Sequence, residues 1–465
     1  MANYKKLGKD ILLMTVGSFG SRVISFIFVP FYTAVLTTDE YGISDLITTT
    51  VTLLLPFFTL TIFESLMRFA LDKENDPKDI WKVGCKVEVI GFFIFLLLSP
   101  IILKTVLKDY YVFVVAYYAT ISFHRCVSYF TRGLNKVKIF AIAGTLQTAM
   151  ISAFSLLFLL VFKIGIAGYL LAHVIAAIIS AVYMIVAAKI YRFGFSIRVR
   201  NKNLQHKMLQ YSVPMIPNSV AWWIANASDR YILTAFVGTA ATGIYSVAYK
   251  IPTIISALTS IFGNAWKLSA VEDFGSEKSQ KFFSDIFSKM TVLMLLVASF
   301  LMVINKPMAH VLFSKDFYQA WQCVPILLMA SVMHAYTEFY GSIYTSSYKT
   351  NFLVISTGIG SVINIILNFI LIPTYHGIGA AIATLIGYAV IWLSRVIHSR
   401  KIMKIDYHLF RDVISYVLAT CQCIVACNSF KYEYVISGSL FLAILIVMRG
   451  EIKGILRMLT KRFIK

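Results

Sequence analysis

Charged residues stand inside long apolar stretches of this chain, where such side chains are rarely found without a use. Arg22 is flanked by Gly17, Gly20 and other small residues, and Lys250 comes just before Pro252. An ionised group at mid-membrane costs at least about 2.5 kcal/mol, so it normally faces a hydrated cavity or a partner. Neither cation has a carboxylate three or four residues away along the chain. Cations of this kind can bind an anionic ligand, and arginine offers forked hydrogen bonds that suit phosphate oxygens.

Carboxylates stand in similar positions. Glu64 and Arg68 are four residues apart, so they can pair with each other on one helix face. Asp229 and Arg230 are adjacent, so they should point to different faces and should not readily pair. At least one of them should bind a partner elsewhere. Glu338 is a further carboxylate inside an apolar stretch.

Membrane-spanning helices must position these charges. Hydrophobic residues make up 58% of the 465 residues and charged residues only 14%, which leaves too little polar surface for a soluble globule. A spanning helix needs roughly 20 mainly apolar residues, and open sheets cannot satisfy their edges in lipid. The sequence therefore predicts an all-α, polytopic membrane protein with about 14 transmembrane helices. The predicted spans are Ile11–Leu36, Tyr41–Leu66, Val87–Leu103, Tyr110–Phe130, Phe140–Phe162, Gly165–Ala188, Leu209–Phe236, Thr242–Trp266, Ile286–Ile304, Cys323–Ser347, Phe352–Pro373, Gly377–His398, Val413–Ser429 and Tyr434–Met448.

Lysine and arginine alternate between the two sides of these predicted spans. The side that holds both termini carries most of them, including Lys5, Lys6, Lys9, Arg68, Lys73, Arg132, Lys136, Arg192, Arg198, Arg200, Lys278, Lys349, Arg400 and the tail after Arg449. The opposite side has only Lys104, Lys108, Lys163, Lys306, Lys315 and Lys431. The positive-inside rule then predicts that both termini are cytoplasmic. The net charge of +21 follows mostly from this bias, so it indicates membrane anchoring and no nucleic-acid partner.

Two short motifs occur twice, at an offset of about 200 residues. The turn Thr33–Ser44 between the first two spans resembles Thr234–Tyr245, and both contain Gly-Ile at the start of a new span. Gly165–Gly168 likewise resembles Gly377–Ala380. Internal repeats of this kind are typical of transporters. They predict two six-helix lobes in pseudo-twofold relation along the membrane normal, with a central cavity and two additional C-terminal helices.

The sequence thus divides into five predicted parts. They are an N-lobe of helices 1–6 (residues 1–190), a cytoplasmic inter-lobe linker (191–208), a C-lobe of helices 7–12 (209–400), helices 13–14 (410–449) and a tail (450–465). In the tail, apolar residues recur at helical spacing opposite basic ones. This pattern predicts a basic amphipathic helix at the cytoplasmic membrane surface.

Several chemistries find no support in the sequence. It contains no nucleotide-binding loop of the Walker type, and the first span is too long for a cleavable signal core. Cys421, Cys423 and Cys427 have no histidine or carboxylate beside them, so they are better interpreted as small core residues than as a metal site. His173 and His334 could carry protons, although hydrogen-bonded packing is the simpler interpretation. We therefore expect no enzymatic activity, no cofactor and no metal.

A set of motifs around the seventh and eighth predicted spans carries a family resemblance. The motifs are Tyr211–Asn218, Trp222-Trp223, Ser228–Leu233 and Gly243–Lys250, together with Arg22 and the turn Thr37–Gly42. With them, the chain resembles the Wzx-type polysaccharide flippases of the multidrug, oligosaccharidyl-lipid and polysaccharide exporter superfamily. The resemblance covers essentially the whole chain.

The resemblance implies a substrate and a direction of movement. The substrate would be an oligosaccharide repeat unit, such as an O-antigen unit, linked through pyrophosphate to a polyprenyl lipid such as undecaprenol. It would move from the cytoplasmic to the outer leaflet of the bacterial cytoplasmic (inner) membrane. Arg22 and Lys250 match the cationic residues that such proteins use, and Arg125 and Arg230 are further candidates for substrate binding.

Without ATP, the energy would come from an ion gradient or the membrane potential, which is worth about 2.3 kcal/mol per charge per 100 mV. Asp229, Glu338 and Glu64 are the candidates for coupling to a proton or a sodium ion. Membrane lipids and a polysaccharide polymerase are the other expected partners. Alternating access of the two lobes would expose the cavity to one side at a time.

Other functions remain open at this stage. A multidrug or metabolite antiporter of the same superfamily would favour an acidic chamber. A lipid II flippase would be distinguished by failed cell-wall synthesis on its loss. A membrane-embedded sugar polymerase or ligase would be expected to have longer outer loops than this chain.

Overall fold

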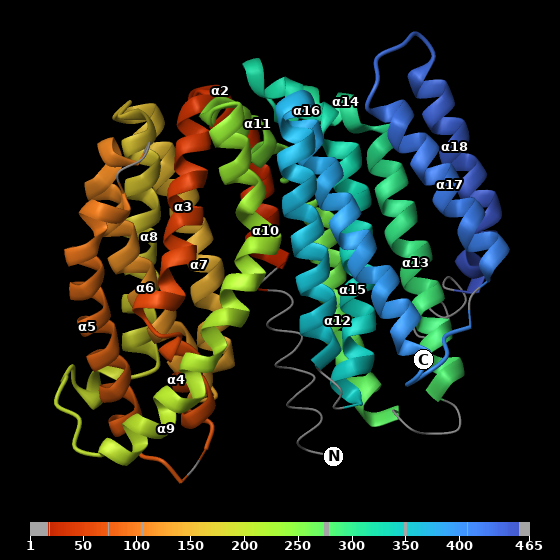
Figure 1. Cartoon of the computed structure of the whole chain (residues 1–465). Helices are drawn as coiled ribbons and strands as arrows, with labels where there is room; N and C mark the ends of the chain where they lie inside the picture. The colour runs from red at the N-terminus through yellow and green to blue at the C-terminus, as the bar shows by residue number, and fades with distance from the viewer. Residues whose placement is uncertain are drawn as a thin grey trace. The chain divides into compact units, whose positions relative to one another are not determined.

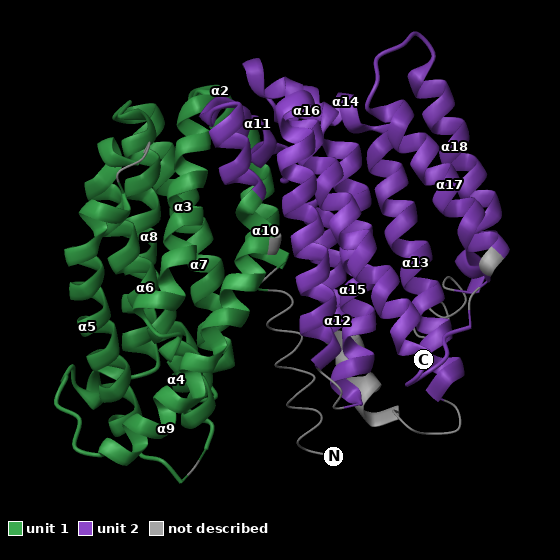
Figure 2. Cartoon of the chain, in the orientation of Figure 1, with its two compact units in different colours: residues 1–228 green, residues 229–465 purple. Residues whose placement is uncertain are grey.

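The computed structural model consists of helices joined by turns and short loops (Figure 1). It describes residues 17, 19–72, 74–103, 107–273, 279–347, 351–406 and 408–454. The chain divides into two compact units, residues 1–228 and 229–465, and the boundary falls inside one helix (Figure 2). The all-α class predicted from the sequence is confirmed. The predicted limits of the N-lobe, linker and C-lobe stay a prediction.

Unit 1 contains the predicted spans one to six. The first helical segment described is Phe19–Val35, and its last part is α2 (Val29–Val35). The helices that follow are α3 (Thr38–Phe58), α4 (Ile62–Ala70), α5 (Pro77–Ile102), α6 (Tyr111–Gly133), α7 (Val137–Leu156), extended by the π-helical turn Leu157–Val161, α8 (Gly165–Ala187) and α9 (Lys202–Ser212). Helix α10 (Ile216–Phe236) begins in unit 1 and ends in unit 2.

Polar caps fix where several of these helices begin. The Thr37 hydroxyl accepts a hydrogen bond from the Glu40 backbone N–H, and the Glu40 carboxylate accepts one from the Thr37 N–H, which forms a capping box at α3. The second Glu40 oxygen accepts a bond of 3.4 Å from the Ile166 N–H at the start of α8. Helix α5 begins earlier than the predicted Val87, because Asp76 caps it and Pro77 is its first residue.

The predicted second span is broken in the structure. Between α3 and α4, Leu60 and Thr61 adopt left-handed backbone conformations, with φ of +51° and +48°. The neighbouring helix α5 crosses this break at Gly91, where an added Cβ would lie 1.9 Å from the Phe58 carbonyl oxygen. Only glycine allows this approach, so the crossing of α5 over the break depends on Gly91.

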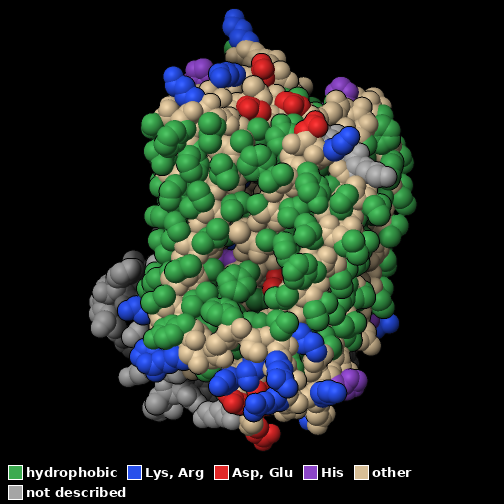
Figure 3. Space-filling view, turned by 90° about the vertical axis from the view of Figure 1, so that its left-hand side faces the viewer, with side chains coloured by type: hydrophobic (Ala, Val, Ile, Leu, Met, Phe, Trp, Pro, Cys, Tyr) green, Lys and Arg blue, Asp and Glu red, His purple; other side chains and the backbone are tan. Residues whose placement is uncertain are grey.

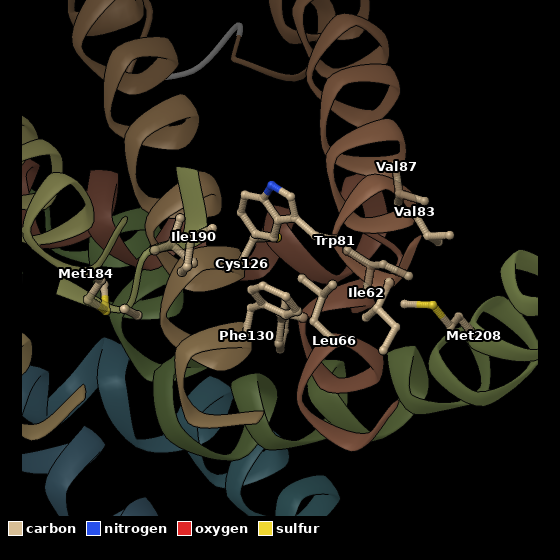
Figure 4. Packing of buried hydrophobic residues seen from close by; sticks show 14 of the residues in the cluster. Ile62, Leu66, Trp81, Val83, Val87, Cys126, Phe130, Met184, Ile190 and Met208 are labelled. Carbon is tan, nitrogen blue, oxygen red and sulfur yellow. The ribbon is translucent and has the colours of Figure 1, made fainter. Parts of the chain in front are cut away.

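A hydrophobic cluster joins α4, α5, α6 and α9 of unit 1 (Figure 4). The rings of Trp81 and Phe130 stack with their centroids 5.0 Å apart, and both side chains are fully buried. Leu66 of α4 and Met208 of α9 complete the contact. Burying side chains of this size stabilises a fold by about 1.5–3 kcal/mol each.

Helix α9 is fastened to unit 1 by hydrogen bonds as well. The Thr61 hydroxyl donates to the Ser212 carbonyl oxygen and the Ser65 hydroxyl to the Met208 carbonyl oxygen, both at 2.6 Å. Helix α9 begins within the segment 191–208, so the C-terminal part of the predicted linker is an ordered helix that packs on α4.

Unit 2 contains the remaining helices. They are α11 (Thr239–Ala248), α12 (Thr253–Asp273), α13 (Ser279–Val303), α14 (Asn305–Leu312), α15 (Val324–Ser346), α16 (Asn351–Ser399), α17 (Leu409–Ala426) and α18 (Glu433–Val447). Helix α16 contains the predicted spans eleven and twelve, and the break between them is at His376, with φ of +50°. The predicted repeats fall at helix starts, at α3 and α8 in unit 1 and at α11 and the second half of α16 in unit 2.

The last two helices are tied to α13 by a buried amide. The Gln422 side-chain N–H group donates to the Ser299 carbonyl oxygen at 3.0 Å and to the Ser437 carbonyl oxygen at 3.2 Å. Lys306 forms an ion pair with Glu433 at one end of α18. These contacts make α17 and α18 part of unit 2.

The surface suits a membrane protein. One face carries a broad band of mostly hydrophobic side chains, with most of the charged side chains above and below it (Figure 3). Among the residues that the structure describes, six helices are long and apolar enough to cross a membrane, and α11 with α12 would make a seventh as one bent span. The chain is a multi-pass membrane protein, while the predicted total of 14 spans is not tested by these criteria.

The predicted cationic residues Lys5, Lys6 and Lys9 and the tail from residue 455 onward lie outside the described residues.

Candidate functional site

Asp229 is the centre of a buried polar cluster in unit 2. Its side chain is 4% exposed and lies on α10, near the boundary between the units. One carboxylate oxygen accepts a hydrogen bond of 2.7 Å from the Tyr245 hydroxyl and a longer one of 3.5 Å from the Tyr249 hydroxyl. The Tyr245 hydroxyl also lies 3.5 Å from the Thr384 hydroxyl of α16. Three helices therefore contribute to the surroundings of one buried carboxylate.

Arg230 contacts the same cluster. Its guanidinium lies over the Tyr249 ring, 5.1 Å from the centroid, and one of its nitrogens is 3.8 Å from an Asp229 oxygen. The expectation that these adjacent residues do not pair was therefore wrong, because the long arginine side chain folds back toward the carboxylate. The expectation that one of them binds elsewhere is confirmed by the bond from Tyr245 to Asp229.

Lys250 lies at a break in the predicted eighth span. Helix α11 ends at Ala248 and α12 begins at Thr253, and their axes differ by 48°. Pro252 has no N–H to donate, so the chain cannot continue a regular helix through this point. The Lys250 side chain is half-buried at the bend. Interrupted helices of this kind often line ion or substrate pathways in transporters.

A second group of ionisable residues lies on α15 and α16. Glu338 and His334 are one helical turn apart, both half-buried, and they interact electrostatically with each other. The His334 ring packs edge-on against Tyr388, with centroids 4.9 Å apart. Arg395 of α16 interacts electrostatically with both Glu338 and His334. Unit 2 thus gathers an acid, an imidazole, a phenol and a guanidinium in its interior.

Arg395 was not predicted from the sequence. Its side chain is 5% exposed and donates to three hydrogen-bond acceptors within 3.0 Å, on α15 and the first half of α16. A signal did exist, because Arg395 stands inside an apolar span and Ser356 and Thr357 supply hydroxyls in the preceding span. Its position near the end of the span made it look like an ordinary boundary residue.

Arg22 lies in the first helical segment of unit 1. The same segment packs on α7 through Gly17, whose Cβ position is 3.2 Å from the Ala141 carbonyl oxygen, and through Gly20. At about 100° per residue, Arg22 is about 200° around the helix from Gly20, away from the small-residue face. The side chain is half-buried. Arg22 is thus a cation on an apolar helix, and it lies on the side of that helix away from α7.

Glu64 and Arg125 come together in unit 1. The expected pair of Glu64 with Arg68 is not formed, although the structure describes both residues. The Glu64 carboxylate instead interacts electrostatically with Arg132 and Arg125 of α6 and hydrogen-bonds Tyr129. The Arg125 guanidinium lies 5.7 Å from the Phe63 ring centroid. The reason is packing, because α4 and α6 are in close contact and α6 offers two guanidinium groups.

Other polar residues of unit 1 have structural partners. Nδ1 of His173 donates to the Tyr169 carbonyl oxygen at 2.9 Å, which agrees with the packing interpretation of this histidine. Glu88 is 8% exposed and accepts a bond of 3.1 Å from the Cys126 thiol.

The predicted site residues are distributed over both units, and in unit 2 Tyr388 interacts electrostatically with both Asp229 and Glu338. In unit 2, Asp229, Arg230 and Lys250 are close in the chain, and Glu338 has Arg395 and His334 beside it. In unit 1, Glu64 and Arg125 share one cluster, and Arg22 is on another helix. Carboxylates surrounded by hydroxyls can bind a proton or a small cation. Guanidinium and ammonium groups in apolar helices can bind phosphate oxygens.

The fold agrees with that of known membrane transporters. It matches a lipid II flippase MurJ in an inward closed conformation with a TM-score of 0.69, covering 96% of this chain and 99% of that one at 13% identity. It matches an inward-facing multidrug resistance transporter of the MATE family with a TM-score of 0.58, covering 82% and 97% at 13% identity. A transporter of the MOP superfamily from Pyrococcus furiosus matches with a TM-score of 0.55, covering 91% and 97% at 11% identity. This chain therefore has the same fold as these transporters.

Sequence comparison identifies the family to which this chain belongs. Residues 7–266, more than half of the chain, match the model of the family described as polysaccharide biosynthesis protein. The chain belongs to this family. An uncharacterized membrane protein of Methanocaldococcus jannaschii is 25% identical over 433 residues, which is 86% of this chain and 99% of that protein. Family and fold together confirm the resemblance that the motifs indicated.

Proposed function

We propose that this protein is a flippase for a lipid-linked oligosaccharide. It moves a polyprenyl-pyrophosphate-linked repeat unit from the cytoplasmic to the outer leaflet by alternating access. Membership in the polysaccharide biosynthesis family and the superfamily fold support a glycan-related transport function. The observation that carries the proposal is the placement of cations in apolar helices, above all Arg22 and, at a helix break, Lys250.

The physical argument concerns desolvation. A pyrophosphate head and a sugar chain cannot enter hydrocarbon unaided, because losing their water costs far more than thermal energy. Guanidinium and ammonium groups replace the lost water with charge-assisted hydrogen bonds. We assign Arg22 and Lys250 to the pyrophosphate, with Arg125 and Arg230 as additional contacts. The lipid tail remains in the bilayer.

Energy for the movement comes from a proton or sodium gradient or from the membrane potential. Asp229, Glu338 and Glu64 are the proposed coupling carboxylates. Asp229 is the best supported of the three, because it is the most buried and one of its oxygens accepts hydrogen bonds from phenolic hydroxyls. Cytoplasmic termini, an inner-membrane location and a polysaccharide polymerase as partner belong to the same proposal.

The test combines variants with a defined lipid probe. The purified protein is reconstituted in phospholipid vesicles that contain undecaprenyl-pyrophosphate N-acetylglucosamine, and a lectin outside the vesicles reports sugar that has crossed. Arg22→Ala and Lys250→Ala are expected to reduce the crossing rate at least about tenfold, a loss of about 1.4 kcal/mol of stabilisation. Lys289→Ala is the matched control, because this lysine pairs with Asp285 on the same helix. Wild-type rates in both variants would contradict the cationic mechanism.

The fold is also compatible with two competing functions. Its likeness to a lipid II flippase makes lipid II an alternative cargo, and a multidrug or metabolite antiporter is a further alternative in the superfamily. Deleting the gene separates the three. Loss of surface glycan with retained growth supports the proposed cargo, arrest of cell-wall synthesis supports lipid II, and altered drug sensitivity alone supports an antiporter.

A further inference from the structure

The segment between α8 and α9 brings many cations to the surface of unit 1. Its exposed basic side chains, between residues 191 and 207, are Arg192, Arg198, Arg200, Lys202 and Lys207. Together with three exposed apolar or aromatic residues, they form what we call the linker surface; the three are Tyr191, Phe195 and Ile197. The chain contains no aspartate or glutamate from residue 110 to residue 228, so this segment supplies no counter-charge of its own.

The carboxylates of the neighbouring helix α5 have partners of their own. Asp76 caps the first turn of α5, and Asp79 pairs with Lys82 at 3.2 Å. Glu88 is buried and accepts a hydrogen bond from the Cys126 thiol. Within the residues that the structure describes, none of the arginines of the linker surface forms an ion pair. The linker surface therefore retains a net positive charge.

Packing against unit 1 fixes the linker surface in place. Ile190, at the start of the segment, is fully buried. The Phe195 ring packs edge-on against the Trp81 ring with centroids 5.9 Å apart, although Phe195 is still 58% exposed. Tyr191 and Ile197 are exposed to a similar degree. The segment thus presents aromatic and aliphatic side chains between its cations.

The linker surface begins where the lipid-facing side of α8 ends. Ile178, Val182 and Val186 recur every four residues along α8 and are all well exposed, as expected of a stripe that faces lipid. Tyr191 follows Val186 by five residues, a rise of about 10 Å at most in helical geometry. The headgroup layer on each side of a bilayer is about 5–7 Å thick, and tyrosine is enriched there. The linker surface is therefore at the level of the headgroups.

We propose that the linker surface binds anionic phospholipid headgroups of the adjacent leaflet. Guanidinium groups form charge-assisted hydrogen bonds with phosphate oxygens, while the exposed rings and Ile197 lie among the glycerol and upper acyl groups. Each cation near an anionic membrane surface strengthens binding about fivefold. The proposal concerns the bilayer around the protein, so it does not depend on which cargo the protein moves.

The test places a fluorescent reporter on the linker surface itself. Ile197→Trp adds an indole at an exposed position of the full-length protein, and the difference from the wild type gives its fluorescence. The protein is reconstituted in mixed bilayers of phosphatidylcholine and phosphatidylglycerol, in which one lipid or the other carries brominated acyl chains. Bromine quenches an indole that it touches. At equal mole fractions of brominated lipid, quenching is expected to show an enrichment of phosphatidylglycerol at the reporter of at least about fivefold.

Arg198→Gln/Arg200→Gln is the decisive variant in this background. It removes two cations next to the reporter and is expected to lower the enrichment at least about fivefold. The matched control is Lys401→Gln/Lys404→Gln, which removes the same charge from exposed positions of unit 2 and is expected to keep the enrichment. Equal quenching by the two brominated lipids, or an enrichment that the arginine variant leaves unchanged, would overturn the proposal. So would a lack of quenching by either lipid, because the linker surface would then face water and suit an acidic soluble partner.

A second measurement needs no arginine substitution, so it decides the matter even where the double variant folds poorly. Raising the salt concentration shortens the Debye length from about 30 Å at 0.01 M to about 3 Å at 1 M. In the Ile197→Trp protein, the enrichment of phosphatidylglycerol is expected to disappear over this range, while phosphatidylcholine still quenches the reporter. An enrichment that does not depend on salt would contradict recognition by charge.

Discussion

The bond from Tyr245 to Asp229 gives a sharp prediction about stability. Tyr245→Phe removes a single hydroxyl that donates over 2.7 Å to a carboxylate that is 4% exposed. Hydrogen bonds to charged groups contribute about 1.5–3 kcal/mol in soluble proteins, whereas those between membrane helices reach at most about 1.7 kcal/mol. Asp229 keeps the Arg230 backbone N–H as a donor at 2.9 Å. We therefore expect Tyr245→Phe to lower the free energy of unfolding by about 1.5 kcal/mol.

Tyr249→Phe is the matched control. The same type of hydroxyl is removed, but its distance to the same oxygen is 3.5 Å, at the limit of a hydrogen bond. Tyr249→Phe is expected to lower the free energy of unfolding by about 0.5 kcal/mol or less. The free energy of unfolding is measured by steric trapping in lipid bicelles. In an Asp229→Asn background, the effect of Tyr245→Phe is expected to shrink, because the acceptor no longer carries a charge. Equal costs for the two tyrosine variants would refute the reasoning.

Two further predictions concern packing. Gly91→Ala is expected to abolish most of the folded yield, because its methyl group would lie 1.9 Å from the Phe58 carbonyl oxygen. In Gly144→Ala, the control, the methyl group meets no atom within 4 Å, so this variant is expected to raise the free energy of unfolding by up to about 1 kcal/mol. Size-exclusion chromatography of the tagged variants checks both, and similar yields would contradict the close crossing. Gln422→Leu is expected to cost about 2 kcal/mol and to expose the loop between α17 and α18 to protease, because it removes the donor shared with α13 and α18. Unchanged proteolysis would show that this amide does not hold the helices together.

Hydropathy was sufficient to find the elements but not their irregularities. The predicted spans Tyr110–Phe130 and Gly165–Ala188 differ by only a few residues from α6 and α8, because apolar length decides where a helix can lie in a bilayer. The break at Leu60 and Thr61 carries no such signal. Neither residue is a glycine or proline, and the close crossing of α5 beside their left-handed backbone is a tertiary contact that hydropathy does not encode.

The site was predictable where a residue type alone is informative. Asp229 was identified because a carboxylate in an apolar stretch must find a partner, but the sequence could not name Tyr245 as that partner. It also could not foresee that the Arg230 side chain reaches back to its neighbour. Arg395 was missed because it lies near the end of its predicted span, where a basic residue is typical of an ordinary helix boundary.

The repeated turn is fastened differently in its two copies. In unit 1, the Glu40 carboxylate bonds the starts of both α3 and α8. In unit 2, Ala241 occupies the corresponding place in the turn, and Gly377 instead packs where a Cβ would lie 3.3 Å from the Cys323 sulfur. Dissolved salt screens a half-buried carboxylate in part but leaves van der Waals contact almost unaffected. We therefore expect ionic strength to weaken this end of unit 1 more than that of unit 2, so that the two copies of the turn respond to different solvent conditions.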